Sequence, residues 1–424
     1  MVQLGSALLN LQLAVFTLTI AVFLVGVVSI VFPRLARYTR ARDFELARMR
    51  ADAEVRETAA RFHVPDATPI DSAAVKIFRA QQGRVRRVHD QAREAQEIYR
   101  DRVVRCVASL WLAIIATALS ATVFHDAKEL KPYVAALDLV AMLWVFHQWW
   151  SALAENYRWA ALRIKAELLR QENFLTAVFA PANADVPSDA DIDRRFAERE
   201  KEMDETVIAP KPMRFRAWLR SLVRTKADSP STEKALRSYW GRRRAYLAPN
   251  EDGAASFAPN DLLQYIHSRP LDQFRWFRRA RYRLRRSGQR RAALLACLFV
   301  TAILLAAVKM AFTHVDEASV QASTLGNLLS FAVFAITASS AALTSLYLGR
   351  NDRSLLHRYA AQERRIEDWL GGFLPKVPGI GTLLAAPVSR SSLTEDVLSF
   401  EDLMIDELVD WLHISQHDTI ELAP

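Results

Sequence analysis

Two charged residues interrupt stretches of the sequence that are otherwise apolar. Asp138 lies in the apolar stretch over residues 133–150 and Lys309 in the stretch over residues 292–312. If these stretches cross a membrane as helices, the two charges lie at similar depths from the same side. A charge in lipid is costly unless it is paired or hydrated. One interpretation is that Lys309 extends to the lipid headgroups and Asp138 reaches the headgroups or the nearby turn. The other is an ion pair or a charged ring at the outer mouth of a water-filled path.

Hydroxyl residues recur along one face of two of these stretches. They are Ser330, Thr337 and Thr344, which are seven residues apart, and Ser109, Thr117 and Ser120. Small and hydroxyl side chains allow transmembrane helices to approach closely, so helix packing is the default interpretation. A hydroxyl-lined pore is the alternative, and with so few helices it requires several copies of the chain.

No motif for catalysis or cofactor binding is present. The sequence holds no phosphate-binding glycine loop, no nucleophile elbow and no zinc-type cluster of Cys and His. His413 and His417 are four residues apart, and we expect them to be solvated rather than bound to a metal. Cys106 and Cys297 fall within apolar stretches, where small apolar packing is expected. The sequence therefore predicts no enzyme, no cofactor and no metal.

Five apolar stretches are long enough to cross a bilayer as helices. They cover residues 7–32, 103–124, 133–150, 292–312 and 325–348. A hydrocarbon core of about 30 Å needs ~20 helical residues, and a backbone in lipid has to satisfy its own hydrogen bonds. The sequence therefore predicts an all-α integral membrane protein with an N-terminal anchor helix and two transmembrane hairpins.

Arginine gathers at alternate ends of these stretches. Six arginines follow the first stretch within residues 34–50 and nine precede the fourth within residues 275–291, whereas residues 313–324 hold no Lys or Arg. Cytoplasmic loops carry an excess of Lys and Arg, so the N-terminus is predicted outside and the C-terminus inside. The expected location is a bacterial inner membrane, with the first helix retained as an anchor rather than cleaved as a signal peptide.

Charge is divided unevenly along the chain. All 56 Lys and Arg residues and 38 of the 47 Asp and Glu residues lie before Ser391, and the other nine acids follow it. The default interpretation of the basic part is membrane topology with contact to anionic lipid headgroups. No nucleic-acid motif is present, so nucleic acid is not an expected partner. The acidic tail and the arginine-rich helices have opposite charge, and a resting state in which they dock through many weak ion pairs is a further hypothesis.

The sequence predicts five segments along the chain. They are an anchor with its juxtamembrane helix (1–62), a first hairpin unit (63–180), a cytoplasmic linker (181–255), a second hairpin unit (256–376) and a connector with an acidic helix (377–424). Long polar helices are expected to continue from the hairpins into the cytoplasm, and Pro270 is expected to kink or restart one of them.

The acidic helix is predicted around residues 399–412. Hydrophobic residues recur at helical spacing, which gives it one apolar side. These residues are Phe400, Leu403, Met404, Leu408 and Trp411.

A basic amphipathic helix is expected within the linker. Phe215, Trp218 and Leu219 form its apolar side, opposite Arg216 and Arg220. A helix of this kind can lie in the headgroup plane of a membrane. Packing on the protein's own helices is the other interpretation, and the sequence leaves both open.

Two segments resemble SLATT domains, the bacterial two-transmembrane effector domains that associate with SMODS and SLOG proteins. The pattern after a hairpin is matched by Tyr157, Arg158, Ala166, Glu167, Leu168 and Arg170. The pattern before a hairpin is matched by Asp272, Gln273, Trp276 and Phe277. The resemblance covers residues 72–180 and 260–372 and implies two copies in tandem. The N-terminal anchor and the acidic tail depart from the simple pattern.

The resemblance implies an oligomeric membrane effector that forms or gates an ion-leaky pore in bacterial anti-phage or conflict defence. A sensor protein or a nucleotide second messenger would be the trigger, although no nucleotide-sensing domain is recognisable in the sequence. The alternative is a non-conducting membrane scaffold that recruits a soluble partner through its cytoplasmic helices. A transporter is a weaker interpretation because inverted repeats and broken helices are not evident.

Overall fold

A computed structural model of the chain is helical throughout the residues that it describes. These are residues 38–39, 41–64, 73–123, 131–179, 188–206, 232–247, 259–313, 332–333, 336–337, 340, 352–377 and 390–417. The all-α class predicted from the sequence is therefore confirmed for this part of the chain.

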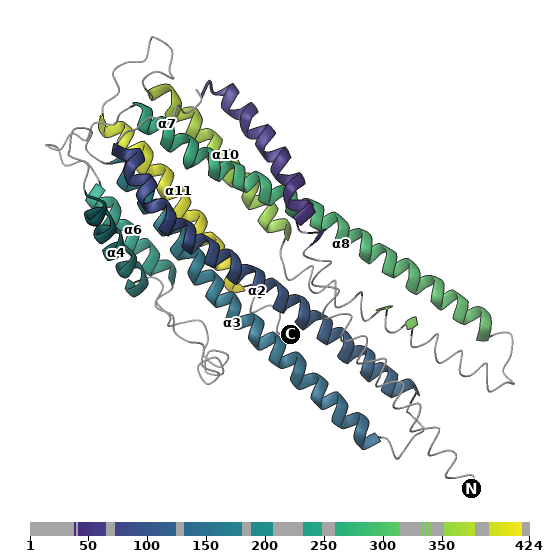
Figure 1. The fold of residues 1–424 in the computed structure, drawn as a ribbon. Helices are drawn as coiled ribbons and strands as arrows, with labels where there is room; N and C mark the ends of the chain where they lie inside the picture. The colour runs from purple at the N-terminus through teal and green to yellow at the C-terminus, as the bar shows by residue number, and fades with distance from the viewer. Residues whose placement is uncertain are drawn as a thin grey trace, which may run out of the picture. The chain divides into compact units, whose positions relative to one another are not determined.

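The helices with defined bounds are α2 (Ala73–Val123), α3 (Lys131–Val178), α4 (Asp189–Thr206), α6 (Thr232–Leu247), α7 (Pro259–Ser268), α8 (Pro270–Thr313), α10 (Asp352–Phe373) and α11 (Arg390–His417). Helices α2, α3 and α8 are long, with 51, 48 and 44 residues, and they run through much of the structure (Figure 1). A further helix covers residues 41–61, and the 3-10 turn η1 (Leu374–Lys376) follows α10. The 51 residues of α2 extend about 75 Å at the usual rise per residue.

Contacts between residues divide the chain into two compact units, each assembled from separate segments. Unit 1 comprises Met1–Asp43, Glu97–Glu155 and Leu284–Asp352, and unit 2 comprises Phe44–Gln96, Asn156–Arg283 and Arg353–Pro424. Helices α2, α3 and α8 each contribute one part to unit 1 and the remainder to unit 2. The apolar parts of these three helices belong to unit 1.

Unit 2 has a hydrophobic core to which helices distant in the sequence contribute. The ring of Phe174 on α3 stacks on Phe78 of α2, with 5.1 Å between the ring centroids, and meets Tyr265 of α7 edge-on. Phe400 of α11 contacts Tyr265 and also Trp369 of α10. Because α11 contacts both helices through a fully buried ring, it is a central element of unit 2.

The helix α11 is longer than the acidic helix predicted from the sequence. It covers 28 residues, Arg390–His417, and joins the core instead of forming an appended tail. The predicted apolar side is confirmed. Phe400, Met404, Leu408 and Trp411 are buried, and Leu403 is partly buried against the core.

Pro270 restarts a helix, as the sequence predicts. Helix α7 ends at Ser268, Arg269 forms a turn, and Pro270 is the first residue of α8. Proline at this position loses no helical hydrogen bond, because the first N–H groups of a helix have no intrahelical partner. The Arg269 N–H donates to the Tyr265 carbonyl at 2.8 Å, so the turn holds Arg269 firmly between the two helices.

Unit 1 exposes large apolar side chains. On α3 and α8 they are Leu139, Val140, Met142, Leu143, Trp144, Phe146, Leu294, Phe299, Val300, Ile303, Leu304, Val308 and Met310. Among the described residues, one helical segment, Leu262–Val308, is long and apolar enough to cross a membrane. Its most apolar window has a mean hydropathy of 2.4, and none of that window is buried. Membrane association is thereby supported, whereas five spans remain a prediction.

Candidate functional site

Several of the candidate site residues lie outside the described part of the chain. They are the pore candidates Ser330 and Thr344, and the residues of the predicted interfacial helix Phe215, Arg216, Trp218, Leu219 and Arg220. Asp138 lies on α3, Lys309 on α8, and Thr117 and Ser120 on α2, but their side chains also lie outside the described part. The predicted ion pair, charged ring and interfacial helix therefore stay predictions.

Ser109 is the one residue of its row whose side chain is described. It is buried in unit 1, and its Oγ accepts a hydrogen bond of 3.1 Å from Nε1 of Trp144. This bond joins α2 to α3 within the first predicted hairpin. At this position the contact favours helix packing over a pore lining, because the hydroxyl is already engaged between the two helices.

Thr337 lies in the fifth predicted span and is exposed. Its hydroxyl donates to the Val333 carbonyl at 2.8 Å, one helical turn earlier, so its hydrogen-bonding capacity is met locally. Ser340 is buried, although the seven-residue spacing did not select it. It makes the same kind of bond, at 2.8 Å, to the Ile336 carbonyl. Spacing alone therefore does not identify which hydroxyls in this segment are buried.

The arginines before the apolar part of α8 are largely paired with acids. In unit 1, Asp43 lies 3.1 Å from Arg286 and 2.7 Å from Arg290. In unit 2, Asp52 lies 2.8 Å from Arg279 and 3.2 Å from Arg275. The sequence interpretation assigned these arginines to topology and lipid headgroups. The structure adds a packing role, since they fasten the helix over 41–61 to α8.

Arg278 and Arg281 of α8 share a buried carboxylate. Glu363 of α10 is almost fully buried and lies 3.0 Å from Arg278 and 2.9 Å from Arg281. Two more acids, Glu54 and Glu367, also contact Arg278. Burial raises the pKa of Glu363 to about 7, although the two arginines oppose this shift. A proton is therefore taken up or released at Glu363 near neutral pH.

Seven acids of α11 form ion pairs with basic residues of the other helices of unit 2. The pairs are Glu395 and Asp402 with Arg244, Asp396 with Lys376, Glu401 with Arg269, Asp406 with Arg237, Glu407 with Arg163, and Asp410 with Arg358. These contacts agree with the hypothesis that the acidic tail docks on basic helices. The burial of α11 shows that this docking is part of the folded core of unit 2.

Among the described residues, the most deeply buried ion pair joins α11 to the turn between α7 and α8. Arg269 donates from Nε and Nη2 to the two oxygens of Glu401 at 3.1 and 2.9 Å. The Tyr265 hydroxyl donates to the same carboxylate at 3.0 Å. Arg269 is 1 % exposed and Glu401 is fully buried. Burial alone would lower the pKa of Arg269, but Glu401 outweighs it and raises the pKa.

A second acid reaches Arg269 from α3. Oε2 of Glu167 lies 3.4 Å from Nη1 of Arg269. The Gln273 side-chain oxygen, in the orientation that satisfies its neighbours, accepts from Arg269 at 2.9 Å and from Arg170 at 3.0 Å. Burial alone would raise the pKa of Glu167, but the positive charges of Arg170 and Arg269 outweigh it and hold the pKa at about 2. Glu167 therefore stays ionised and completes a cluster that ties three helices together.

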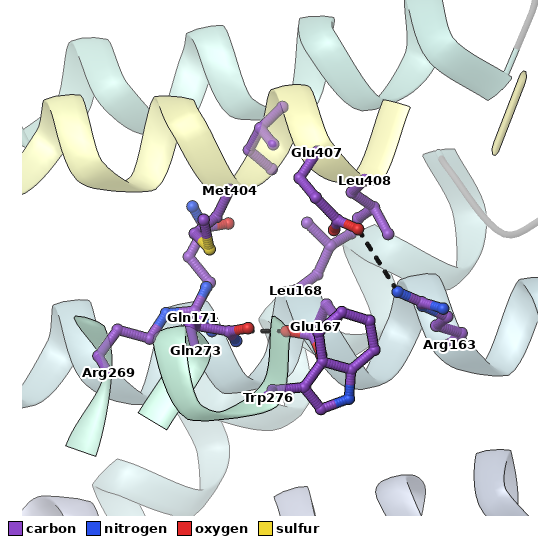
Figure 2. Close-up of a pocket in the computed structure, with 11 residues that line it drawn as sticks. Arg163, Glu167, Leu168, Gln171, Arg269, Gln273, Trp276, Met404, Glu407 and Leu408 are labelled. Atoms are coloured by element: carbon purple, nitrogen blue, oxygen red, sulfur yellow. Dashed lines mark hydrogen bonds and ion pairs between the residues drawn. The ribbon is translucent and has the colours of Figure 1, made fainter. Parts of the chain in front are cut away.

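A small cavity lined by both polar and apolar side chains lies beside this cluster, between α3, α8 and α11 (Figure 2). Its volume of about 20 Å³ is enough for one or two water molecules and far too small for a nucleotide or an organic cofactor. The described residues hold no group of three His, Cys, Asp or Glu side chains that could bind a metal. The charged cluster is therefore suited to holding helices together.

Sequence reasoning missed the buried ion pairs of unit 2. Besides Arg269 and Glu401, these include Arg243 of α6, which donates to both oxygens of Glu172 at 2.9 and 2.6 Å. One signal was available, because Glu401 directly follows Phe400 and lies on the apolar side of the predicted helix. An acid on an apolar helix face indicates a buried partner. Glu172 gave a similar signal, because it lies between Leu168 and Leu175 at helical spacing on a face that is otherwise apolar.

The chain matches no protein-family model, and no curated protein or solved structure is significantly similar to it. The SLATT resemblance therefore stays a prediction that rests on the short sequence patterns alone.

Proposed function

We propose that this protein is an integral membrane protein in which unit 1 lies in the bilayer and unit 2 in water. The observation that carries the proposal is the set of large apolar side chains exposed on α3 and α8 in unit 1. Ile303, for example, is 68 % exposed, whereas core residues of unit 2 such as Phe274 are fully buried. Apolar side chains gain roughly 2 kcal/mol each on leaving water, and lipid can supply that environment.

Within this frame, we propose the function of an oligomeric effector that forms or gates an ion-leaky pore. The apolar helices would assemble in a bacterial inner membrane with the N-terminus outside, and anionic headgroups would contact the remaining arginines. The resemblance to SLATT domains supports a role in anti-phage or conflict defence, with a sensor protein or a nucleotide signal as the trigger. Unit 2 would act as the gate, because α2, α3 and α8 each continue from it into unit 1.

Expression of the full chain in a bacterial host tests conduction directly. The expected result is membrane depolarisation and slowed growth, measured with a potential-sensitive dye, together with ion leakage from liposomes that contain the purified protein. Ile303→Arg provides the matched control, because a charge in the apolar part of α8 is expected to prevent insertion and abolish leakage. If the protein is inserted and shows no depolarisation and no leakage, the effector proposal is contradicted.

A non-conducting scaffold is the second candidate, and one observation favours it. The two predicted pore hydroxyls that the structure describes, on Ser109 and Thr337, are both engaged in hydrogen bonds within the protein. A scaffold would recruit a soluble partner through unit 2 and leave the membrane sealed. Inserted protein that leaves liposomes tight, yet retains a partner on its unit 2 surface in a pull-down, would support this function.

Deleting the acidic tail is a poor test of gating. Val397, Leu398, Phe400 and Leu408 of α11 are buried in the core of unit 2. Removal of residues 391–424 is therefore expected to unfold unit 2 instead of releasing a restraint. Single substitutions at the ion pairs of α11 leave its apolar side in place, and they are the better probes of any gate.

A further inference from the structure

The cavity of unit 2 has hydrogen-bonding groups on opposite walls. Glu167 and Gln171 of α3 lie one helical turn apart on one wall, and Glu407 of α11 lies on another. Arg163 and Arg269 also line the cavity. The two arginines balance the two acids in charge, so a neutral ligand that both donates and accepts hydrogen bonds suits the cavity better than an ion.

Gln171 brings an unsatisfied donor to this cavity. Its side chain is only 3 % exposed, and its Nε2 has no hydrogen-bond acceptor among the described residues. Leaving a buried amide donor unpaired is costly, and native proteins almost always satisfy such groups with protein or with ordered water. We therefore expect a hydrogen-bond acceptor inside the cavity, next to Nε2 of Gln171.

Glu407 brings an acceptor whose protein contacts are incomplete. The nearest basic group, on Arg163, is 3.7 Å away, which is too long for a hydrogen bond. No hydrogen bond from the described residues reaches this carboxylate. Arg163 is also held between two aromatic rings, at 5.3 Å from Trp276 and 4.1 Å from Trp411, which fixes the guanidinium in place.

We propose that the cavity binds one or two ordered water molecules that join α3 to α11. The water accepts a hydrogen bond from Nε2 of Gln171 and donates to the carboxylate of Glu407, with Glu167 as a further acceptor. Protein-bound waters of this kind usually make about three hydrogen bonds, and these three side chains supply them. Glu407 is then the acid of α11 that reaches its neighbour helix through water. This inference concerns unit 2 alone and does not depend on pore formation.

A double-mutant cycle on the full chain in lipid nanodiscs tests the bridge. The measured quantity is the opening equilibrium constant of the α11 peptide, obtained from hydrogen–deuterium exchange and mass spectrometry. Gln171→Met removes the donor at similar size and is expected to increase opening. If water links the two side chains, the effects of Gln171→Met and Glu407→Gln deviate from a simple product by about threefold or more.

The matched control pairs Gln171→Met with Asp410→Asn, which lies one turn further along α11 and does not line the cavity. Those two effects are expected to multiply within about twofold. If the cavity holds no water, Gln171→Met alone is not expected to increase the opening of α11. Loss of an unpaired buried donor would leave opening unchanged or decrease it, and either result would overturn the proposal, as would a multiplicative cycle with Glu407→Gln.

Discussion

Unit 1 and unit 2 differ in where they place large apolar side chains, which are exposed in unit 1 and buried in unit 2. In unit 2, Phe274, Phe277 and Leu168 are buried, and arginines are paired with acids inside the fold. In unit 1, residues of comparable size such as Ile303 and Met142 are more than 60 % exposed. One chain thus carries two surfaces, each suited to a different solvent.

The continuity of α2, α3 and α8 makes this difference informative. A single helix changes from a buried, charge-paired environment to an exposed apolar one as it passes from unit 2 to unit 1. In α8, Arg278 and Arg279 contact acids, whereas Phe299 and Val300 are exposed. Under the proposed function, this change within one helix marks the boundary between water and lipid.

The largest expected effect is the loss of the buried pair in unit 2. Arg269→Met leaves Glu401 buried without its partner and should destabilise unit 2 by about 3–5 kcal/mol. Arg237→Gln removes an exposed ion pair with Asp406 and should cost only about 0–1 kcal/mol. Unfolding of the purified protein, followed by tryptophan fluorescence, measures both. Equal losses would show that burial does not distinguish these pairs.

A charge on the apolar part of α8 comes next in size. If unit 1 lies in lipid, Ile303→Arg should cost about 2.5–3.5 kcal/mol of insertion free energy near the middle of a span. The matched control is Met49→Arg on the helix over residues 41–61, where a residue of unit 2 that is 67 % exposed should tolerate the charge within about 0.5 kcal/mol. Carbonate extraction of membranes reports the inserted fraction. Equal insertion of both variants would place the two surfaces in the same solvent.

Glu363 gives unit 2 a pH dependence. The folded state binds a proton at this site more tightly than the unfolded state, because its pKa rises from 4.5 to about 7. Its contribution to stability is therefore full below pH 4.5, falls by about 3 kcal/mol as the pH rises to about 7, and is constant above that. Glu363→Gln should remove this fall. Parallel stability curves for the two proteins between pH 4.5 and 7 would contradict the assignment.

The smallest expected effect lies in the predicted hairpin of unit 1. Trp144→Phe removes the hydrogen bond to Ser109 and should weaken the contact of α2 with α3 by about 0.6 kcal/mol. The loss should disappear when Ser109 is already Ala. Steric trapping of the helices in bicelles can resolve a difference of this size. A full effect of Trp144→Phe in the Ser109→Ala background would show that the bond is not the cause.

The sequence predicted elements whose signals are local. Pro270 restarts a helix because of its own chemistry, and Phe400, Met404 and Leu408 are buried because their spacing puts them on one side of α11. Such features depend on neighbours within a few turns. For this reason the all-helical class and the apolar side of the last helix were predictable.

The partners in the charged cluster were not predictable in the same way. Arg269 and Glu401 are 132 residues apart, and Arg243 and Glu172 are 71 apart. Helical periodicity states which face a residue occupies and leaves open which other helix covers that face. Glu401, on the apolar side of α11, indicates that a buried partner exists but does not identify that partner. The pore candidate Ser109 shows the same gap, because its partner Trp144 lies on another helix that spacing within α2 does not reveal.

Labelling of a native cysteine tests the central claim most directly. Cys297 lies in the apolar part of α8, and the protein itself leaves it exposed. In membrane fragments that are open to the reagent on both faces, we predict that a charged maleimide does not react with Cys297 in a Cys106→Ser background, because lipid covers this surface, and that detergent or urea exposes it. In the same fragments, Ser238→Cys on the exposed side of α6 should react readily. Labelling of Cys297 to the same high level as position 238 while the bilayer is intact would contradict the account, because it would place unit 1 in water.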